Sequence, residues 1–60
     1  MMNEYFVKIE PFHEGKSLGV QCFILNAKNG MEAVKETVRI IDKKYEPAEI
    51  TKELIDVHRL

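Results

Sequence analysis

Hydrophobic residues recur at helical spacing over one long stretch of the chain. One stripe, with intervals of three or four residues, is formed by Met31, Val34, Val38, Ile41 and Tyr45. Beside this stripe lie Ala33, Thr37 and Ile40. Charged residues occupy the opposite side of the same stretch: Lys35, Glu36, Arg39, Asp42 and Lys43. The pattern predicts an amphipathic helix whose apolar stripe faces the core and whose charged side faces water.

Local signals set the limits of this helix. Asn29 can accept hydrogen bonds from the free amides of the first turn, and Glu32 stands at the position from which its side chain reaches back to the Asn29 amide. Pro47 disfavours helical geometry at the residue before it, so the helix should end near Tyr45. We therefore expect Asn29 to be the N-cap.

A strand is predicted before the helix, over Tyr5–Glu10. This segment is rich in aromatic and β-branched residues that alternate between two sides: Tyr5, Val7 and Ile9 against Phe6, Lys8 and Glu10. Pro11 lacks the amide hydrogen that a sheet needs, so pairing should weaken there. The polar, glycine-containing segment His13–Ser17 then predicts the loop of a hairpin.

The second predicted strand runs from about Leu18 to Ala27. After Gln21 it is apolar on both faces, which is typical of a central strand or of a strand exposed at an interface. Both alternatives stay open at this point.

The end of the chain fits two kinds of element. Pro47–Glu49 could open a second helix with Ile50, Leu54 and Val57 on one stripe, whereas Leu54–Leu60 could form a strand. We predict the strand, which can lie parallel to a neighbour after a crossover and so complete a sheet that one hairpin cannot stabilise alone. The expected fold is α+β, a single ββαβ domain over residues 1–60, in which one helix packs on one face of a three-stranded sheet.

Composition limits what such a domain can be. A chain of 60 residues buries only about 60% of the surface that its unfolded form exposes, and a single cysteine excludes a disulfide within the chain. Hydrophobic residues make up 45% of the chain, so a well-packed core and self-association are the remaining sources of stability. The net charge of −1 gives no long-range attraction to nucleic acid or anionic lipid. The N-terminal residues lack the pattern of a signal peptide, so we expect a cytoplasmic protein.

No group of residues predicts catalysis. Asp56 and His58 fall on one face of the last strand and could pair, but an imidazole and a carboxylate without a nucleophile do not make a catalytic site. Cys22 is expected within the sheet, where a thiol usually behaves as a small inert hydrophobe. We therefore expect a protein that is not an enzyme, with no catalytic residues, no metal ligands and no cofactor.

The order of elements resembles that of known small proteins. The residues that carry the likeness are Leu25–Asn29 at the end of the second strand, Glu32–Ala33 at the helix start and Ile55–Leu60 at the close. In this pattern the chain resembles small ββαβ proteins such as archaeal ribosomal protein L20a, and it is similar to short accessory proteins of phages and other mobile elements. Ribosomal proteins of this type are generally basic and this chain is not, so the resemblance implies the fold and carries no functional residue.

A single helix can cover only one side of the sheet, so the other side should be a binding surface. Phe6, Cys22 and Ile24 are the predicted partner-binding residues on that side. The partner is either a second copy, giving a homodimer through the sheet face or an edge strand, or another protein that this chain regulates, such as a host factor of a phage. The alternative function is binding of nucleic acid or the ribosome through aromatic residues of the sheet and Lys35, Arg39 and Lys43 of the helix.

Overall fold

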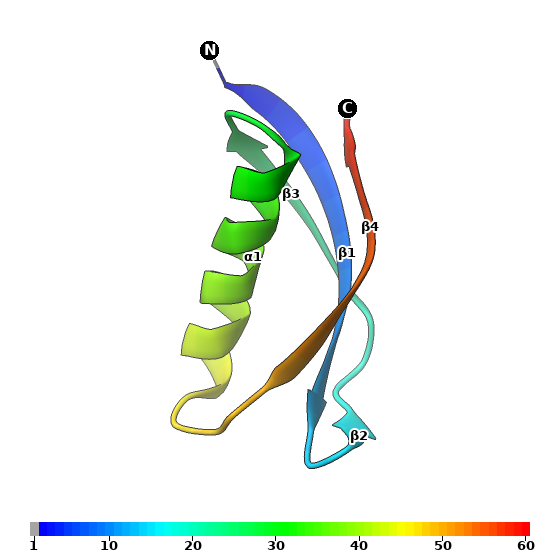
Figure 1. Cartoon of the computed structure of the whole chain (residues 1–60), viewed down its shortest axis with the longest axis vertical. Helices are drawn as coiled ribbons and strands as arrows, with labels where there is room; N and C mark the ends of the chain where they lie inside the picture. The colour runs from blue at the N-terminus through cyan, green and yellow to red at the C-terminus, as the bar shows by residue number, and fades with distance from the viewer. Residues whose placement is uncertain (1) are drawn as a thin grey trace.

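The computed structural model describes residues 2–60 and shows an α+β fold with a four-stranded antiparallel sheet and one helix (Figure 1). The elements are β1 (Asn3–His13), β2 (Lys16–Ser17), β3 (Gln21–Ala27), α1 (Gly30–Tyr45) and β4 (Thr51–Arg59). The predicted class is confirmed, with one strand more than expected. Within residues 2–60, no helix combines the length and the apolar character needed to cross a membrane.

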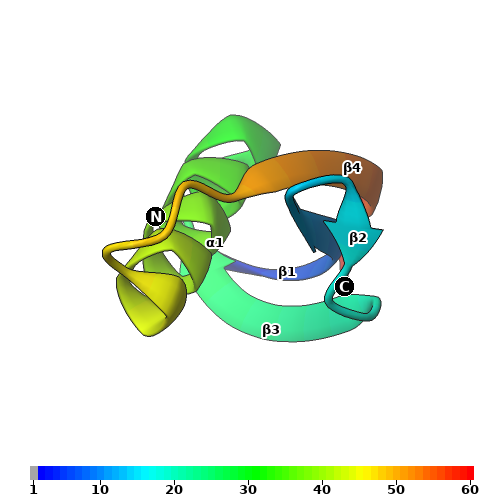
Figure 2. The same ribbon diagram turned by 90° about the horizontal axis from the view of Figure 1, so that it is seen from below.

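β1 is the centre of the sheet because every other strand pairs with it. β3 pairs with one side of β1 from Asn3 to Ile9, and β4 pairs with β1 from Tyr5 to Phe12, both antiparallel. Figure 2 shows β1 between β3 and β4, with α1 on one side of the sheet. β3 is therefore an edge strand, which excludes the first of the two alternatives, a central strand. β4 runs in the same direction as β3, as a crossover requires, but its hydrogen-bonded neighbour is the antiparallel β1.

The fourth strand arises from the way the hairpin is closed. Glu14 and Gly15 both have positive φ, 51° and 79°, which is the geometry of the tight two-residue turn that matches the twist of a hairpin. His13 then pairs with Lys16, and Phe12 with Ser17, so two residues of the expected loop become β2. Gly19, with φ of 94°, separates β2 from β3.

Pro11 does not end β1, contrary to the sequence-based expectation. It is buried and stands opposite Lys52 of β4. The Pro11 carbonyl accepts a hydrogen bond from the Leu18 amide at 2.8 Å. The carbonyl and the nitrogen of one strand residue point to the same side, so the Pro11 nitrogen points away from β4, toward the gap between the paired parts of β2 and β3. The missing amide hydrogen therefore costs the sheet no hydrogen bond with β4.

The helix has the predicted ends but a different buried side. The Asn29 side chain accepts from the Glu32 amide at 2.9 Å, which confirms the N-cap, and α1 ends at Tyr45. The residues of α1 that are fully buried are Ala33, Thr37 and Ile41, whereas Met31 is 69% exposed. The prediction that Met31 lies in the core was therefore wrong.

Small residues explain this rotation of the helix. A Cβ atom added to Gly30 would lie 3.7 Å from Cγ2 of Val57, which is ordinary van der Waals contact, so the first turn lies close beside the sheet. Ala33 packs in the same cluster as Val7, and the buried Thr37 hydroxyl donates to the Ala33 carbonyl at 2.9 Å. The small side chains let α1 approach β1 closely, which turns the larger apolar residues toward the flanks of the helix.

β4 confirms the choice of a strand for the end of the chain, and it begins earlier than predicted, at Thr51. Lys8 pairs with Asp56 and the next residue of β1, Ile9, pairs with Leu54, so Ile55 is an extra residue in β4. This β-bulge shifts the alternation of inward and outward side chains along β4 by one residue. The shift is needed because residues on both sides of the bulge pair with β1 and share the face of their partner there.

The burial of α1 predicts unequal effects for two apolar truncations. Ile41→Ala should lower the free energy of unfolding by about 2–5 kcal/mol, because it leaves a cavity where the side chain is fully buried. Met31→Ala should change it by less than about 0.5 kcal/mol, because the Met31 side chain is mostly exposed. Urea unfolding followed by circular dichroism measures both. Equal losses would contradict the observed orientation of the helix.

Candidate functional site

The side of the sheet that faces away from α1 is the open face. Phe6 of β1 has two neighbours at the same level on this face, Ile24 on β3 and His58 on β4. The next level along β1 holds Lys8, with Cys22 on β3 and Asp56 on β4. The three predicted partner-binding residues, Phe6, Cys22 and Ile24, therefore share one face on two adjacent strands.

Phe6 is held in place by its neighbour on β4. The Phe6 and His58 rings are stacked, with centroids 5.1 Å apart and an interplanar angle of 28°. Nδ1 of His58 donates to Oδ2 of Asp56 at 2.9 Å, so the expected pair of imidazole and carboxylate does form. This hydrogen bond orients the imidazole beside the Phe6 ring.

The β3 side of the open face is more accessible. Ile24 is 63% exposed beside the half-buried Phe6. Cys22 lies within the sheet as expected, but it is an exposed free thiol and not a packed core residue. An exposed isoleucine beside an ordered aromatic ring gives the open face a small apolar centre.

Charges around this centre are mostly negative. Register places four carboxylates and one ammonium group on the open face: Glu4, Glu10, Glu53 and Asp56, with Lys8. Glu10 and Glu53 stand directly opposite each other on β1 and β4. Like charges in such a pair repel. The Ser17 hydroxyl donates to Oε2 of Glu10 at 2.7 Å. The open face therefore attracts cations more than anions.

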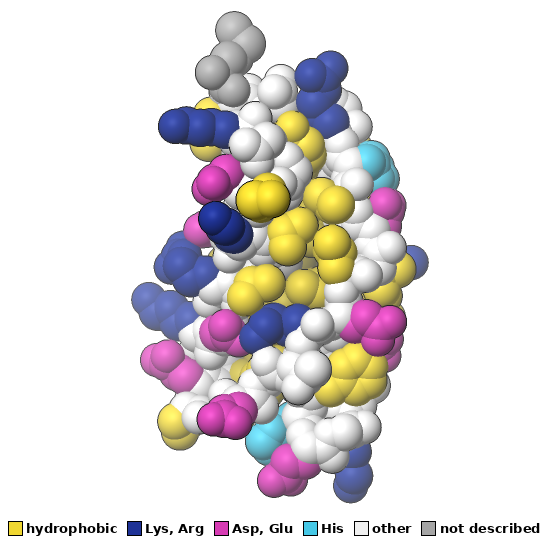
Figure 3. Space-filling view, in the orientation of Figure 1, with side chains coloured by type: hydrophobic (Ala, Val, Ile, Leu, Met, Phe, Trp, Pro, Cys, Tyr) yellow, Lys and Arg dark blue, Asp and Glu magenta, His cyan; other side chains and the backbone are white. Residues whose placement is uncertain are grey.

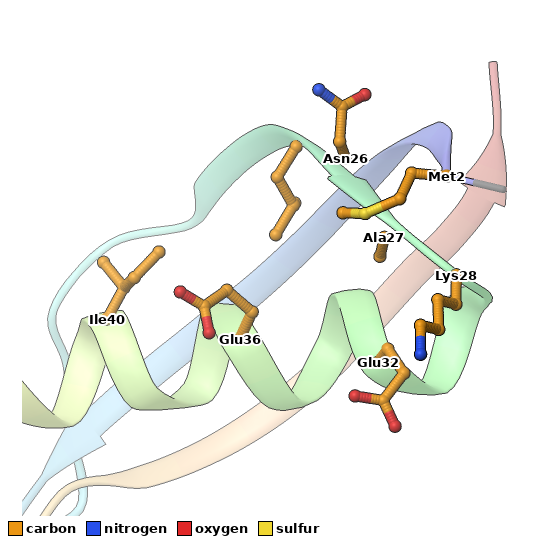
Figure 4. A pocket seen from close by; sticks show the side chains of 8 residues that line it. Met2, Asn26, Ala27, Lys28, Glu32, Glu36 and Ile40 are labelled. Carbon is orange, nitrogen blue, oxygen red and sulfur yellow. The ribbon is translucent and has the colours of Figure 1, made fainter.

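A groove with a volume of about 590 Å³ lies along β3 on the other side of the sheet (Figure 4). Residues from β3, from α1 and from the loop between them line it, together with Met2, which precedes β1: Met2, Leu25, Asn26, Ala27, Lys28, Glu32, Glu36 and Ile40. Sequence reasoning missed this groove. The available signal was Ile40, which lies outside the main helical stripe and is 38% exposed in the structure.

Sequence reasoning also missed an apolar strip where α1 meets β4. Figure 3 shows hydrophobic side chains gathered between the charged outer side of α1 and β4. Met31 of α1 and Leu54 of β4 are both exposed, and Val34, Val38 and Val57 are half-buried. The signal was the width of the apolar arc on the helix, which is greater than one contact with a sheet requires.

The three cationic residues proposed for nucleic-acid binding are exposed on α1, but acids lie among them. Nε of Arg39 donates to Oε2 of Glu36 at 3.0 Å, and Nη2 donates to Oε1 of the same carboxylate. Hydrogen bonding from Arg39 lowers the pKa of the Glu36 carboxyl below its ordinary value. The same hydrogen bonding to Glu36 raises the pKa of the Arg39 guanidinium above its ordinary value. Asp42 pairs with Lys52 of β4. Lys35 and Lys43 therefore lie on a face of mixed charge, as predicted for an exposed helix.

Among residues 2–60, no group of three or more His, Cys, Asp or Glu side chains is placed to hold a metal ion. The groove along β3 contains two glutamates and one lysine among its lining residues, without a nucleophile beside a base.

The Glu10–Glu53 pair predicts a gain in stability on neutralisation. Glu53→Gln should raise the free energy of unfolding by about 0.3 kcal/mol, and Glu53→Lys by up to about 1 kcal/mol, since the latter creates an opposite-charge pair across the strands. Glu49→Gln, at an exposed position outside the sheet, is the matched control and should have little effect. Urea unfolding at low salt measures the series. A loss of stability in both Glu53 variants would show that the carboxylate is held by favourable contacts.

No family model, no curated protein and no solved structure matches the chain. The likeness to ribosomal and phage-type accessory proteins therefore stays a prediction from the sequence pattern.

Proposed function

We propose that this protein is a non-catalytic interaction module that docks another protein on its open sheet face. The observation that carries this proposal is the row formed by His58, Phe6 and Ile24 across three strands. An aromatic residue fixed by a neighbour loses little conformational entropy on binding, which suits it to act as the anchor of an interface. Ile24 supplies accessible apolar area beside that anchor.

The charge of the open face defines the chemistry of the partner. Four carboxylates surround the apolar row and Lys8 is the one cation among them. A partner segment with an apolar side chain flanked by Lys or Arg would fill the row and neutralise these carboxylates. The Glu10–Glu53 pair would gain most, because a cation placed between two facing carboxylates relieves their repulsion. A nucleic acid would bring further negative charge to the same face.

A regulatory role follows from this kind of docking, since a small module without a reaction centre acts by covering or positioning its partner. The proposal that the partner is a host factor of a phage rests on size and sequence pattern alone.

Site-specific cross-linking in cells that make the protein tests the docking face. A photoreactive amino acid replaces Cys22, which is exposed on the open face, and the same probe replaces Met31 or Lys35 on the helix as controls. We expect a protein adduct from position 22, with a cross-linked segment that is apolar and basic, and no such adduct from the two control positions.

The variant Phe6→Glu, made in the protein that carries the photoreactive amino acid at position 22, tests whether the adduct depends on the Phe6 side chain. We expect the adduct to be lost while circular dichroism shows an unchanged fold. The same adduct persisting in Phe6→Glu, the same protein captured mainly from position 31, or cross-linking to nucleic acid from position 22 would each contradict docking on the open face. A self-adduct has twice the mass of the chain, so it is distinguished from an adduct with another protein.

A further inference from the structure

We propose that a second copy of this chain pairs with the free edge of β3, antiparallel and about a two-fold axis at Ile24, to form one continuous six-stranded arrangement of β4, β1 and β3 from each copy. This interface lies at the sheet edge, so it goes beyond the docking proposed for the open face and leaves that face accessible.

The two edges of the sheet differ in how they are protected. β4 carries a bulge at Ile55 and the charged residues Lys52, Glu53, Asp56 and Arg59. Bulges and charges are the features by which edge strands avoid pairing with other chains. β3 has seven residues with no charge, no proline and an unbroken register with β1. Its outer edge is therefore a ready template for another strand.

The length of β3 selects the register. Residues opposite each other in an antiparallel pair lie on the same face, and Ile24 is the middle residue of β3, so an axis at Ile24 matches the faces and pairs the whole strand with its copy. Ile24 then meets Ile24 of the second copy on the open face, and Phe23 meets Leu25 on the face toward α1. Beyond the strand, Lys28 stands opposite Val20 of the second copy, so no like charges oppose each other along the edge.

The groove along β3 fits this arrangement. Leu25, Ala27 and Ile40 provide its apolar lining, and it opens between β3 and α1. Phe23 of the second copy, placed opposite Leu25, would enter this groove from the edge. Aliphatic and aromatic side chains in such cross-strand pairs stabilise a sheet. The groove thus has an occupant of the right chemistry within the chain itself.

The helices add complementary charge. Gln21 donates to the Tyr45 hydroxyl at 3.0 Å, so the C-terminal end of α1 lies beside the start of β3. Because the strands pair antiparallel, this end faces the N-terminal end of the second helix across the axis. The first turn of α1 carries Glu32 and the last turn carries Lys43 and Lys44, so acid faces base on both sides. Three strand spacings of about 4.8 Å set the helices about 14 Å apart, a distance that long side chains can span.

Pairing at this edge also extends the docking surface. Phe6 and Ile24 lie at one level on the open face, and Ile24 meets its copy at the axis. The two apolar rows therefore join in a single line across six strands, from His58 of one copy to His58 of the other. A partner protein would then meet a surface twice as long as that of one chain.

A charge exchange at Ile24 tests the register. Ile24→Lys and Ile24→Glu each place like charges face to face at the axis, and each alone should raise the dimer dissociation constant about tenfold or more, measured by sedimentation over a dilution series. An equimolar mixture of the two variants should recover the dimer, because lysine of one chain then meets glutamate of the other. Ile24 is largely exposed, so both variants should fold.

Phe6→Lys with Phe6→Glu is the matched control pair. Phe6 lies on the central strand and does not meet its copy at the β3 edge, so these variants should remain dimers while losing the docking adduct. A monomeric native chain at the highest concentration tested would overturn the edge pairing and leave the docking proposal standing. Dissociation by the Phe6 variants would place the contact on the open face, and failure of the mixed Ile24 variants to associate would exclude this register.

A cysteine at the axis supplies a second measurement that does not depend on charge. In Cys22→Ser with Ile24→Cys, the two new thiols stand opposite each other, at a separation of about 5 Å between Cα atoms, and mild oxidation should link the chains. The native Cys22 is the control. In the dimer Cys22 would stand opposite Asn26 of the second copy. The Cys22 of the second copy lies about four residues farther along that strand, which is too far for a disulfide. Equal cross-linking of both proteins would overturn the register.

Discussion

The structure depends on β1, because it is the one strand with which all the others pair. Its inward residues Val7 and Ile9 are fully buried under α1, and its outward residues, Phe6 among them, are covered by no helix or strand of the part of the chain that the structure describes. The helix reaches this central strand by presenting small residues to it, with Ala33 fully buried. α1 packs closely on one side of β1, and because a helix covers only one face of a sheet, the other side of the same strand stays open.

The asymmetry of the sheet follows from the small size of the chain. The described residues, 2–60, form one helix, which covers one face, and two outer strands, β3 and β4, which are both edges of the sheet. Of the two edges, β4 carries charges and a bulge, and β3 carries neither. Ile24 belongs to the unprotected edge and to the apolar row of the open face at once. A second copy on the β3 edge and another protein on the open face can therefore be bound side by side, and Ile24 takes part in both contacts.

Much of the fold follows from local patterns in the sequence. The cap at Asn29, the end of α1 at Tyr45 and the alternation along β1 each depend on a few neighbouring residues, and all three are confirmed. The order of strands depends on contacts between distant segments, which is why the sequence leaves open whether β3 is a central or an exposed strand. The rotation of the helix depends on how closely Gly30 and Ala33 approach the sheet, and periodicity alone does not report that distance.

The candidate site divides in the same way. Alternation brings Phe6, Cys22 and Ile24 to one face, because side-chain direction along paired strands is a local property. The stacking of Phe6 on His58 needed the register between β1 and β4, and the groove beside Ile40 needed the rotation of the helix, so neither could be read from the chain.

The most direct measurement is an isotope-filtered NOE experiment on an equal mixture of labelled and unlabelled chain. The account predicts contacts between Phe23 of one copy and Leu25 of the other, together with contacts between the two Ile24 side chains at the axis. Intermolecular contacts that start from Phe6 instead, or none at a concentration where the chain sediments as a dimer, would contradict it.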